Sequence, residues 1–331
     1  MWKRGQRPRT LRTSSGSLYL AVWGLVLVVL ILIVFHFLLG SLQRALEVLA
    51  EDPLGVIIAS AIIASEEALK STRFLIAARS RGERLRPKDA LKVHFAAFAV
   101  GIVTPAFSGA LPTAAAMLGD ILNISPSESL SVAAAVSFFD SMIPSMLTIT
   151  VFPFLGFYSI PLVLIALAII LTWITVLSNE FERALVGLIS RAGQGRVASY
   201  IKAEALRLRP ALLNLLRDRD ALALLTTVSL VSYFLEGVSL YVITGGRLLR
   251  YIYDVVALLV SYVGGNVPTP GGVGGVEYGL SLLISRGDVV RWRVAYLSVG
   301  AVSLSLVGVI ARSYVSYAGK LSEQVRAPNN S

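Results

Sequence analysis

The stretch that decides the fold lies at residues 251–285, which read YIYDVVALLVSYVGGNVPTPGGVGGVEYGLSLLIS. It is apolar and long enough to cross a bilayer, but glycine and proline interrupt it from Gly264 to Gly275. Proline removes a backbone donor from a helix, and glycine loosens the helix further. Inside a membrane, such a break is tolerated only where protein or water covers the backbone. The stretch therefore predicts either a hairpin of two half-helices or one kinked span.

A second broken stretch lies at residues 94–121. The sequence Thr104-Pro105-Ala106-Phe107-Ser108-Gly109 interrupts it, and Pro112 follows. Both broken stretches contain a Thr-Pro dipeptide, which is Thr104-Pro105 in the first and Thr269-Pro270 in the second. Paired broken segments in the two halves of a membrane protein are typical of a transporter-type binding site.

The composition supports a polytopic α-helical membrane protein without a soluble catalytic domain. Of the 331 residues, 55% are hydrophobic and only 15% are charged, whereas soluble domains carry about 25% charged residues. The chain has no cysteine and only two histidines, at no metal-ligand spacing, so we expect no metal and no cofactor. The net charge of +10 comes from basic residues beside apolar stretches. Such residues set topology and touch anionic headgroups, so we expect no nucleic-acid partner.

The order of apolar stretches and basic loops predicts the topology. The apolar stretches lie at residues 18–40, 54–78, 94–121, 128–151, 159–178, 220–243, 251–285 and 294–316. The basic N-terminus (1–17), the loop at 79–92 and the segment 179–219 are predicted to be cytoplasmic. Three full crossings cannot join two loops on one side, so 94–121 is predicted to enter the membrane and return. A hairpin at 251–285 would place the C-terminus in the cytoplasm, and a single kinked span would place it outside.

We interpret residues 18–318 as one transmembrane domain, followed by a polar tail at 319–331. Its first half is 54–178, its connector is 179–219, and its second half is 220–316, so the fold class is an all-α bundle with two inverted-type halves. Residues 198–217 have the pattern of an amphipathic helix, either on the inner membrane surface or as an ordinary connection.

The motif from Pro268 to Glu277 resembles the P-x-P-G-G-x-G-x-x-E hallmark of a known family. That family is the flippase-like transmembrane domain of lysylphosphatidylglycerol synthases and its stand-alone relatives. The order Lys88-Asp89-Ala90, Thr104-Pro105, Gly109 and Asp140 resembles the family's first broken segment. Two features depart from it: no acid follows Pro105, and Ser137-Phe138-Phe139 stands where an arginine commonly precedes the aspartate. Lipid lysylation is not implied, because nothing here resembles the aminoacyl-transferase domain.

Candidate substrate-binding residues fall into two sets. The first set lines the two helix breaks and comprises Thr104, Pro105, Ser108, Gly109, Pro268, Thr269, Pro270, Gly271, Gly272 and Gly274. The helix that follows Gly274 is predicted to offer free N–H groups to a phosphate, although the glycines could instead serve close helix packing. The second set comprises the intramembrane acids Asp140, Glu236 and Glu277, which could also form structural pairs. Glu66 and Lys70 are expected to pair at i,i+4, although Glu66 or Glu67 could instead line the cavity, and His94 is expected at the surface.

These observations predict a flippase or transporter for a lipid or lipid-linked substrate in the cell membrane. Its partners would be membrane lipids, either an anionic phospholipid or a polyprenyl-phosphate-linked molecule. Two alternatives stay open: a membrane enzyme or subunit acting on a lipid-phosphate carrier, and a non-catalytic scaffold. The sequence leaves homo-oligomerisation undecided.

Overall fold

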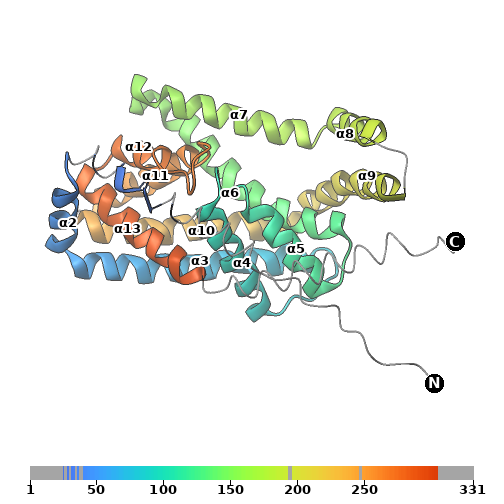
Figure 1. Ribbon diagram of the computed structural model, residues 1–331, viewed down its shortest axis with the longest axis horizontal. Coiled ribbons are helices and arrows are strands. Elements are labelled where there is room, and N and C mark those ends of the chain that lie inside the picture. Colours follow the sequence, from blue (N-terminus) through green and yellow to red (C-terminus); the bar gives the residue numbers. More distant parts are fainter. Residues whose placement is uncertain are drawn as a thin grey trace.

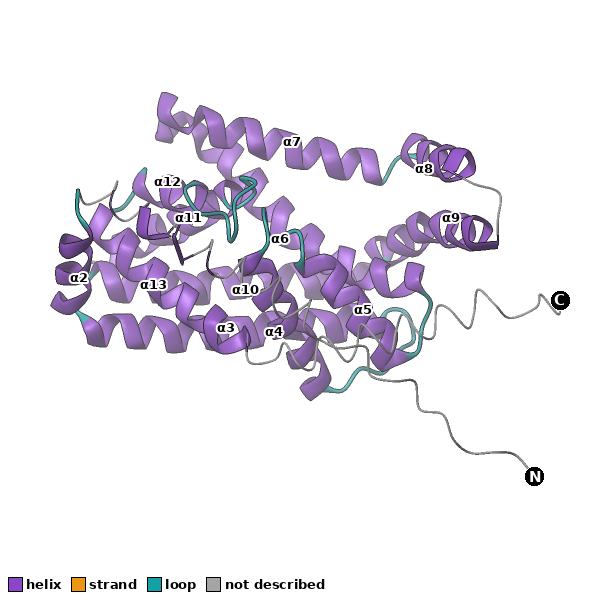
Figure 2. Cartoon of the chain, viewed as in Figure 1, coloured by secondary structure: helices purple, strands orange, loops and turns teal. Residues whose placement is uncertain are grey.

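The computed structural model describes residues 40–192, 196–245 and 248–304, together with isolated positions between 25 and 36. The N-terminus at 1–17, most of the expected span at 18–40 and the tail at 319–331 lie outside these residues. The described chain is an all-α helical membrane bundle, in which short loops join the helices (Figure 2). Its elements are α2 (Leu42–Glu51), α3 (Pro53–Arg79), α4 (Pro87–Val103), α5 (Ala110–Leu122), α6 (Pro126–Leu155), η1 (Phe157–Ser159), α7 (Ile160–Val176), α8 (Asn179–Ala192), α9 (Arg196–Arg217), α10 (Arg219–Thr244), α11 (Leu248–Gly264), α12 (Gly275–Ser281) and α13 (Arg286–Ser303).

Three helical segments of the described chain are each long and apolar enough to cross a membrane: Pro126–Leu155, Phe157–Val176 and Arg219–Thr244. A fourth candidate joins α2 to α3 across a bend of 81°. The predicted stretches at 94–121 and 251–285 are instead divided between shorter helices, because their Pro/Gly segments end one helix and begin another.

Local signals explain where the long helices begin. Ser125 and Glu128 form a capping box at the start of α6, and Pro126 occupies the first turn, where no backbone donor is needed. Ser285 caps α13 by accepting a hydrogen bond of 3.2 Å from the Asp288 amide. The helix therefore begins at Arg286, eight residues before the apolar stretch predicted at 294–316.

Both broken stretches form hairpins. In α11 and α12, a Cβ on Gly264 would lie 2.0 Å from the Gly275 carbonyl oxygen, and a Cβ on Gly279 would lie 2.6 Å from the Ser261 Cα. Residues that advance along α12 thus meet residues that recede along α11, which is the contact pattern of two antiparallel helices. This settles the alternative that the sequence left open in favour of a hairpin.

The first hairpin consists of α4 and α5, with Gly101 packed against Ala110 and Phe107. Figure 1 shows α11 and α12 at the end of the bundle where α2 lies, and α4 and α5 toward the end where α9 lies. The two hairpins therefore approach the middle of the bundle from opposite ends. The loop before α4 and the segment that contains α8 and α9 lie at one end, as the count of crossings predicted.

The core lies around α3, which packs against α10, α13 and α4. Helix α7 presents Leu164, Leu171 and Ile174 outward, each about 60% exposed. Lipid tails solvate such a surface, so this face suits contact with the bilayer. Helix α9 buries Leu212 and Leu215 in the cluster that also contains residues of α6, as expected for a connecting helix that packs on the bundle.

Candidate functional site

The tips of the two hairpins bind each other. Pro105 and Pro270 form an isolated antiparallel β-bridge. The amide of Ala106 donates to the Thr269 carbonyl over 3.1 Å, and the amide of Gly271 donates to the Thr104 carbonyl over 3.3 Å. The two Thr-Pro dipeptides thus meet, although 163 residues lie between Pro105 and Thr269 in the sequence.

Threonine hydroxyls hold each tip in its bent conformation. The Thr104 hydroxyl donates to the Val100 carbonyl over 2.9 Å and accepts from the Gly109 amide over 2.9 Å. In the second tip, the Thr269 hydroxyl donates to the Val273 carbonyl over 2.7 Å. These bonds satisfy backbone groups that a continuous helix would have paired internally.

The conformation of the tips explains their glycines. In the second tip, Gly271, Gly272 and Gly274 have φ values of 58°, 65° and 90°, which a side chain would disfavour. A Cβ on Gly272 would also lie 2.5 Å from the Gly265 Cα. The first tip contains no glycine at its left-handed positions, where Ala106 and Phe107 have φ values of 51° and 54°. Such backbone strain in non-glycine residues is often found at functional sites.

Part of each tip is open. Ser108 in the first tip and Asn266 and Pro268 in the second are exposed, whereas Thr104 and Pro270 are buried. Irregular backbone at membrane depth does not face lipid, because lipid cannot satisfy its polar groups. The exposed residues of the tips therefore suit a surface that faces water or a polar ligand.

Glu277 and Arg293 form a buried pair beside the second tip. One Glu277 oxygen lies 2.8 Å from the Arg293 guanidinium, and the other accepts from the Gly274 amide over 2.7 Å. Arg293 also donates to the Gly271 carbonyl. The Glu277 carboxylate thus occupies the N-terminus of α12, where a phosphate was predicted to bind.

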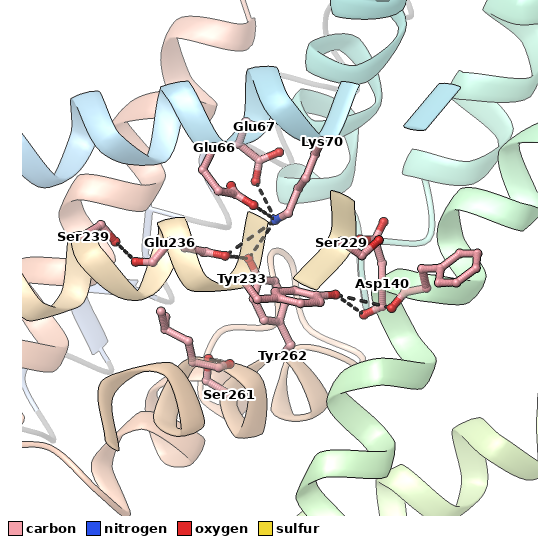
Figure 3. Close-up of polar contacts among 12 residues, drawn as sticks. Glu66, Glu67, Lys70, Asp140, Ser229, Tyr233, Glu236, Ser239, Ser261 and Tyr262 are labelled. Atoms are coloured by element: carbon pink, nitrogen blue, oxygen red, sulfur yellow. Dashed lines mark hydrogen bonds and ion pairs between the residues drawn. The ribbon is translucent and has the colours of Figure 1, made fainter. Parts of the chain in front are cut away.

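A cluster of charges lies inside the bundle, on one face of α3 (Figure 3). The Lys70 ammonium lies 2.8 Å from Glu66, 3.2 Å from Glu67 and 3.6 Å from Glu236 of α10. Lys70 donates to the Tyr262 hydroxyl over 3.1 Å, and Tyr262 in turn donates to Glu236 over 2.6 Å. The predicted Glu66–Lys70 pair is confirmed, but it belongs to a larger network that also takes in Glu236.

His94 belongs to the same cluster. It is only 8% exposed, and its Nε2 atom lies 2.5 Å from a Glu67 oxygen. The expectation that His94 lies at the surface was wrong, because α4 packs along α3 and turns this side chain inward.

Asp140 has an arginine partner from another helix. The Nη1 atom of Arg73 lies 2.5 Å from an Asp140 oxygen and 3.3 Å from the Ser229 hydroxyl. Arg73 is fully buried, and its Nη2 atom has no hydrogen-bond partner within the part of the chain that the structure describes, whereas the Asp140 side chain is 43% exposed. The arginine that Ser137-Phe138-Phe139 lacks is thus provided in space by α3.

The structure therefore divides the predicted site residues into groups. The residues of the two helix breaks come together at the tips, and Glu277 adjoins the second tip. Asp140 and Glu236 instead pair with residues of α3. The predicted site residues did not include Arg73, Arg293 or Tyr262. One signal was available for Arg73, because Glu66, Lys70 and Arg73 follow helical i, i+4, i+7 spacing and so share one face.

The described residues contain no group of three or more His, Asp or Glu side chains that could hold a metal ion. Comparison with protein families gives a match over most of the chain. The model described as "Lysylphosphatidylglycerol synthase TM region" matches residues 20–313. A search of curated proteins finds no match.

Proposed function

Because this chain belongs to the family of the lysylphosphatidylglycerol synthase transmembrane region, we propose that it moves a lipid or lipid-linked substrate with an anionic headgroup between membrane leaflets. The observation that carries this proposal is the meeting of two hairpin tips inside the bundle, with Ser108 and Asn266 exposed there. Two hairpins that approach from opposite ends can each control access to a substrate site from one side of the membrane. The acyl or isoprenoid chains would stay in lipid while the headgroup passes the tips.

Arg73 is the group best suited to recognise the headgroup. It is a buried guanidinium whose Nη2 atom makes no hydrogen bond to the described residues, and its partner Asp140 is partly exposed. A phosphate that enters beside Asp140 could take over part of the guanidinium, since arginine binds phosphate and carboxylate with the same planar fork. Exposed polar groups at the tips, such as the Ser108 hydroxyl, would complete the path.

We place the substrate path in the cell membrane, with α8, α9 and the loop before α4 in the cytoplasm. This orientation follows from basic residues such as Arg81, Arg84 and Lys88, because positively charged loops are retained on the cytoplasmic side.

The test is lipid exchange in liposomes. Purified protein is reconstituted with fluorescent phospholipids or polyprenyl-phosphate analogues, and reductive quenching from outside measures exchange between leaflets. The variants are Asp140→Asn and Arg73→Lys. Their controls are Asp220→Asn at an exposed position of α10 and Arg183→Lys at an exposed position of α8.

We expect each site variant to slow exchange about 10- to 100-fold, because a hydrogen bond to a charged group contributes about 1.5–3 kcal/mol. The control variants should match the wild type. Folded wild-type protein that exchanges no tested lipid would contradict the proposal. Conversion of the lipid phosphate without exchange would indicate a membrane enzyme, and site variants that exchange at the wild-type rate would remove Arg73 and Asp140 from the path.

A further inference from the structure

The charged cluster on α3 contains more acidic than basic side chains. Glu66, Glu67 and Glu236 surround the single ammonium of Lys70, and none of the four residues is more than 5% exposed. If all four were ionised, the cluster would carry two excess negative charges. Buried carboxylates that share a site do not all ionise, because burial and mutual repulsion both favour a bound proton.

The charged and titratable groups that face the cluster do not remove this excess. Helix α4 contributes His94, and the tyrosines Tyr233, Tyr262 and Tyr296 come from α10, α11 and α13. The two nearby arginines have their own acids: Arg73 pairs with Asp140 of α6, and Arg293 pairs with Glu277 of α12. Even with His94 protonated, one negative charge would remain unmatched among the described residues.

The hydrogen-bond partners indicate which acid holds the proton. Glu67 is in contact with both His94 and Lys70, and Glu236 accepts from the Tyr262 hydroxyl and also faces Lys70. Glu66 is fully buried, and among the described residues neither of its oxygens has a hydrogen-bond partner; its ionic contact there is the Lys70 ammonium at 2.8 Å. Its side chain points toward Lys70 (Figure 3). An ionised carboxylate is costly in such a position and a neutral carboxyl is much less so.

We propose that Glu66, Glu67, Lys70 and Glu236 form a proton-binding site in which Glu66 carries the proton, and that this proton couples lipid movement to a pH gradient. The proton is taken from water and returned to water, so no other reactant is needed. The coupling, but not the proton site, rests on the proposed function.

The geometry of α3 offers a means of coupling. Lys70 and Arg73 lie three residues apart on this helix, and each joins α3 to α10, Lys70 through Glu236 and Arg73 through Ser229. A relative movement of α3 and α10 that frees Arg73 for a headgroup also changes the distance between Lys70 and Glu236. The free energy of proton binding at Glu66 thereby depends on the state of the headgroup site.

The first experiment detects the proton directly and needs no transport. Infrared spectroscopy of the purified protein, in water and in deuterium oxide, measures the carbonyl stretch of neutral carboxyl groups. We expect a deuterium-sensitive band near neutral pH that Glu66→Gln removes and that Glu47→Gln, at an exposed position of α2, leaves intact. Absence of the band in the wild type, or its persistence in Glu66→Gln, would overturn the proposal.

The fold of Glu66→Gln is informative as well. Glutamine imitates a neutral glutamic acid, so this variant should keep a wild-type melting temperature in detergent. A variant that fails to fold would show that the carboxylate charge is required, which also contradicts a neutral Glu66.

The second experiment tests coupling in liposomes with a pH gradient of one unit. If one proton moves with each lipid, the labelled lipid should reach a leaflet ratio of about tenfold, because one pH unit is worth about 1.4 kcal/mol. Glu66→Gln should abolish this asymmetry, and Glu47→Gln should retain it. Exchange without asymmetry in the wild type would refute coupling while the flippase proposal stands. An infrared band without any exchange would leave the proton site standing and refute the flippase proposal.

Discussion

Arg293 of α13 stabilises the second hairpin tip through two contacts. Its guanidinium lies 2.8 Å from Glu277, and it also donates a hydrogen bond to the Gly271 carbonyl. Glu277 in turn accepts from the Gly274 amide at the start of α12. One ion pair therefore holds both the loop and the short helix of this hairpin. Both side chains are about 1% exposed, so neither charge can turn to water if the other is lost.

Removal of either partner should destabilise the protein strongly. We expect Glu277→Gln and Arg293→Met each to cost about 3–5 kcal/mol, since each leaves a buried charge or a buried polar group without its partner. The double variant should cost clearly less than the sum of the two. The measurement is a double-mutant cycle from unfolding in detergent. Additive effects would show that the two side chains do not act as a pair.

Close contact between the backbones of α11 and α12 makes a second prediction. A Cβ on Gly264 would lie 2.0 Å from the Gly275 carbonyl oxygen, and backbone cannot move aside as a side-chain end can. Gly264→Ala should therefore lower stability by about 1–3 kcal/mol or more through overpacking. Gly187→Ala in α8 is the matched control, since a Cβ there meets nothing within 4 Å. The control should be neutral or slightly stabilising, and equal losses in both variants would argue against the close approach.

The contact between the tips can be tested by a disulfide. Pro105 and Pro270 face each other as a non-hydrogen-bonded antiparallel pair, for which the Cα atoms lie about 4.5 Å apart. Disulfides form at such separations, and the chain has no native cysteine to interfere. We expect Pro105→Cys/Pro270→Cys to lose maleimide reactivity when it is oxidised mildly and then denatured for labelling, while each single variant treated in the same way stays reactive. Persistent reactivity of the oxidised double variant would contradict the tip contact.

The same double variant also tests whether the tips take part in lipid exchange. If a headgroup must part the tips to pass, the disulfide should stop lipid exchange in liposomes and a reductant should restore it. Exchange at an unchanged rate in the oxidised protein would place the path elsewhere.

Much of the fold could be predicted from local signals. Proline and glycine cause the breaks at Thr104–Gly109 and Gly264–Gly275, and their effect on a helix does not depend on distant residues. The pairing of Glu66 with Lys70 follows from helical spacing alone. The enter-and-return path of 94–121 was predicted because three apolar stretches lie between two basic segments, 79–92 and 179–219, that belong on the same side.

The remaining features depend on contacts between helices. Arg73 meets Asp140 across 67 residues of sequence, and no spacing rule connects them. The run from Arg286 to Arg293 has the hydropathy of a loop, yet it begins α13, because Arg293 is neutralised by Glu277 inside the fold. His94 was misplaced for a similar reason, since its burial depends on Glu67 of a neighbouring helix.

The excess of acids around Lys70 predicts how stability should respond to pH when the lysine is removed. In Lys70→Met, Glu66, Glu67 and Glu236 lose their common cation, so the folded state must bind further protons that the unfolded state does not need near neutral pH. Stability then rises as pH falls, because the folded state binds more protons than the unfolded state. We expect Lys70→Met to melt well below the wild type at pH 8 and to approach it at pH 5. Lys92→Met is the control: its ammonium is half exposed and faces Asp89 at 3.6 Å, so its loss should cost at most about 1 kcal/mol. A deficit in Lys70→Met that is the same at both pH values would mean that the three acids are not held together by Lys70.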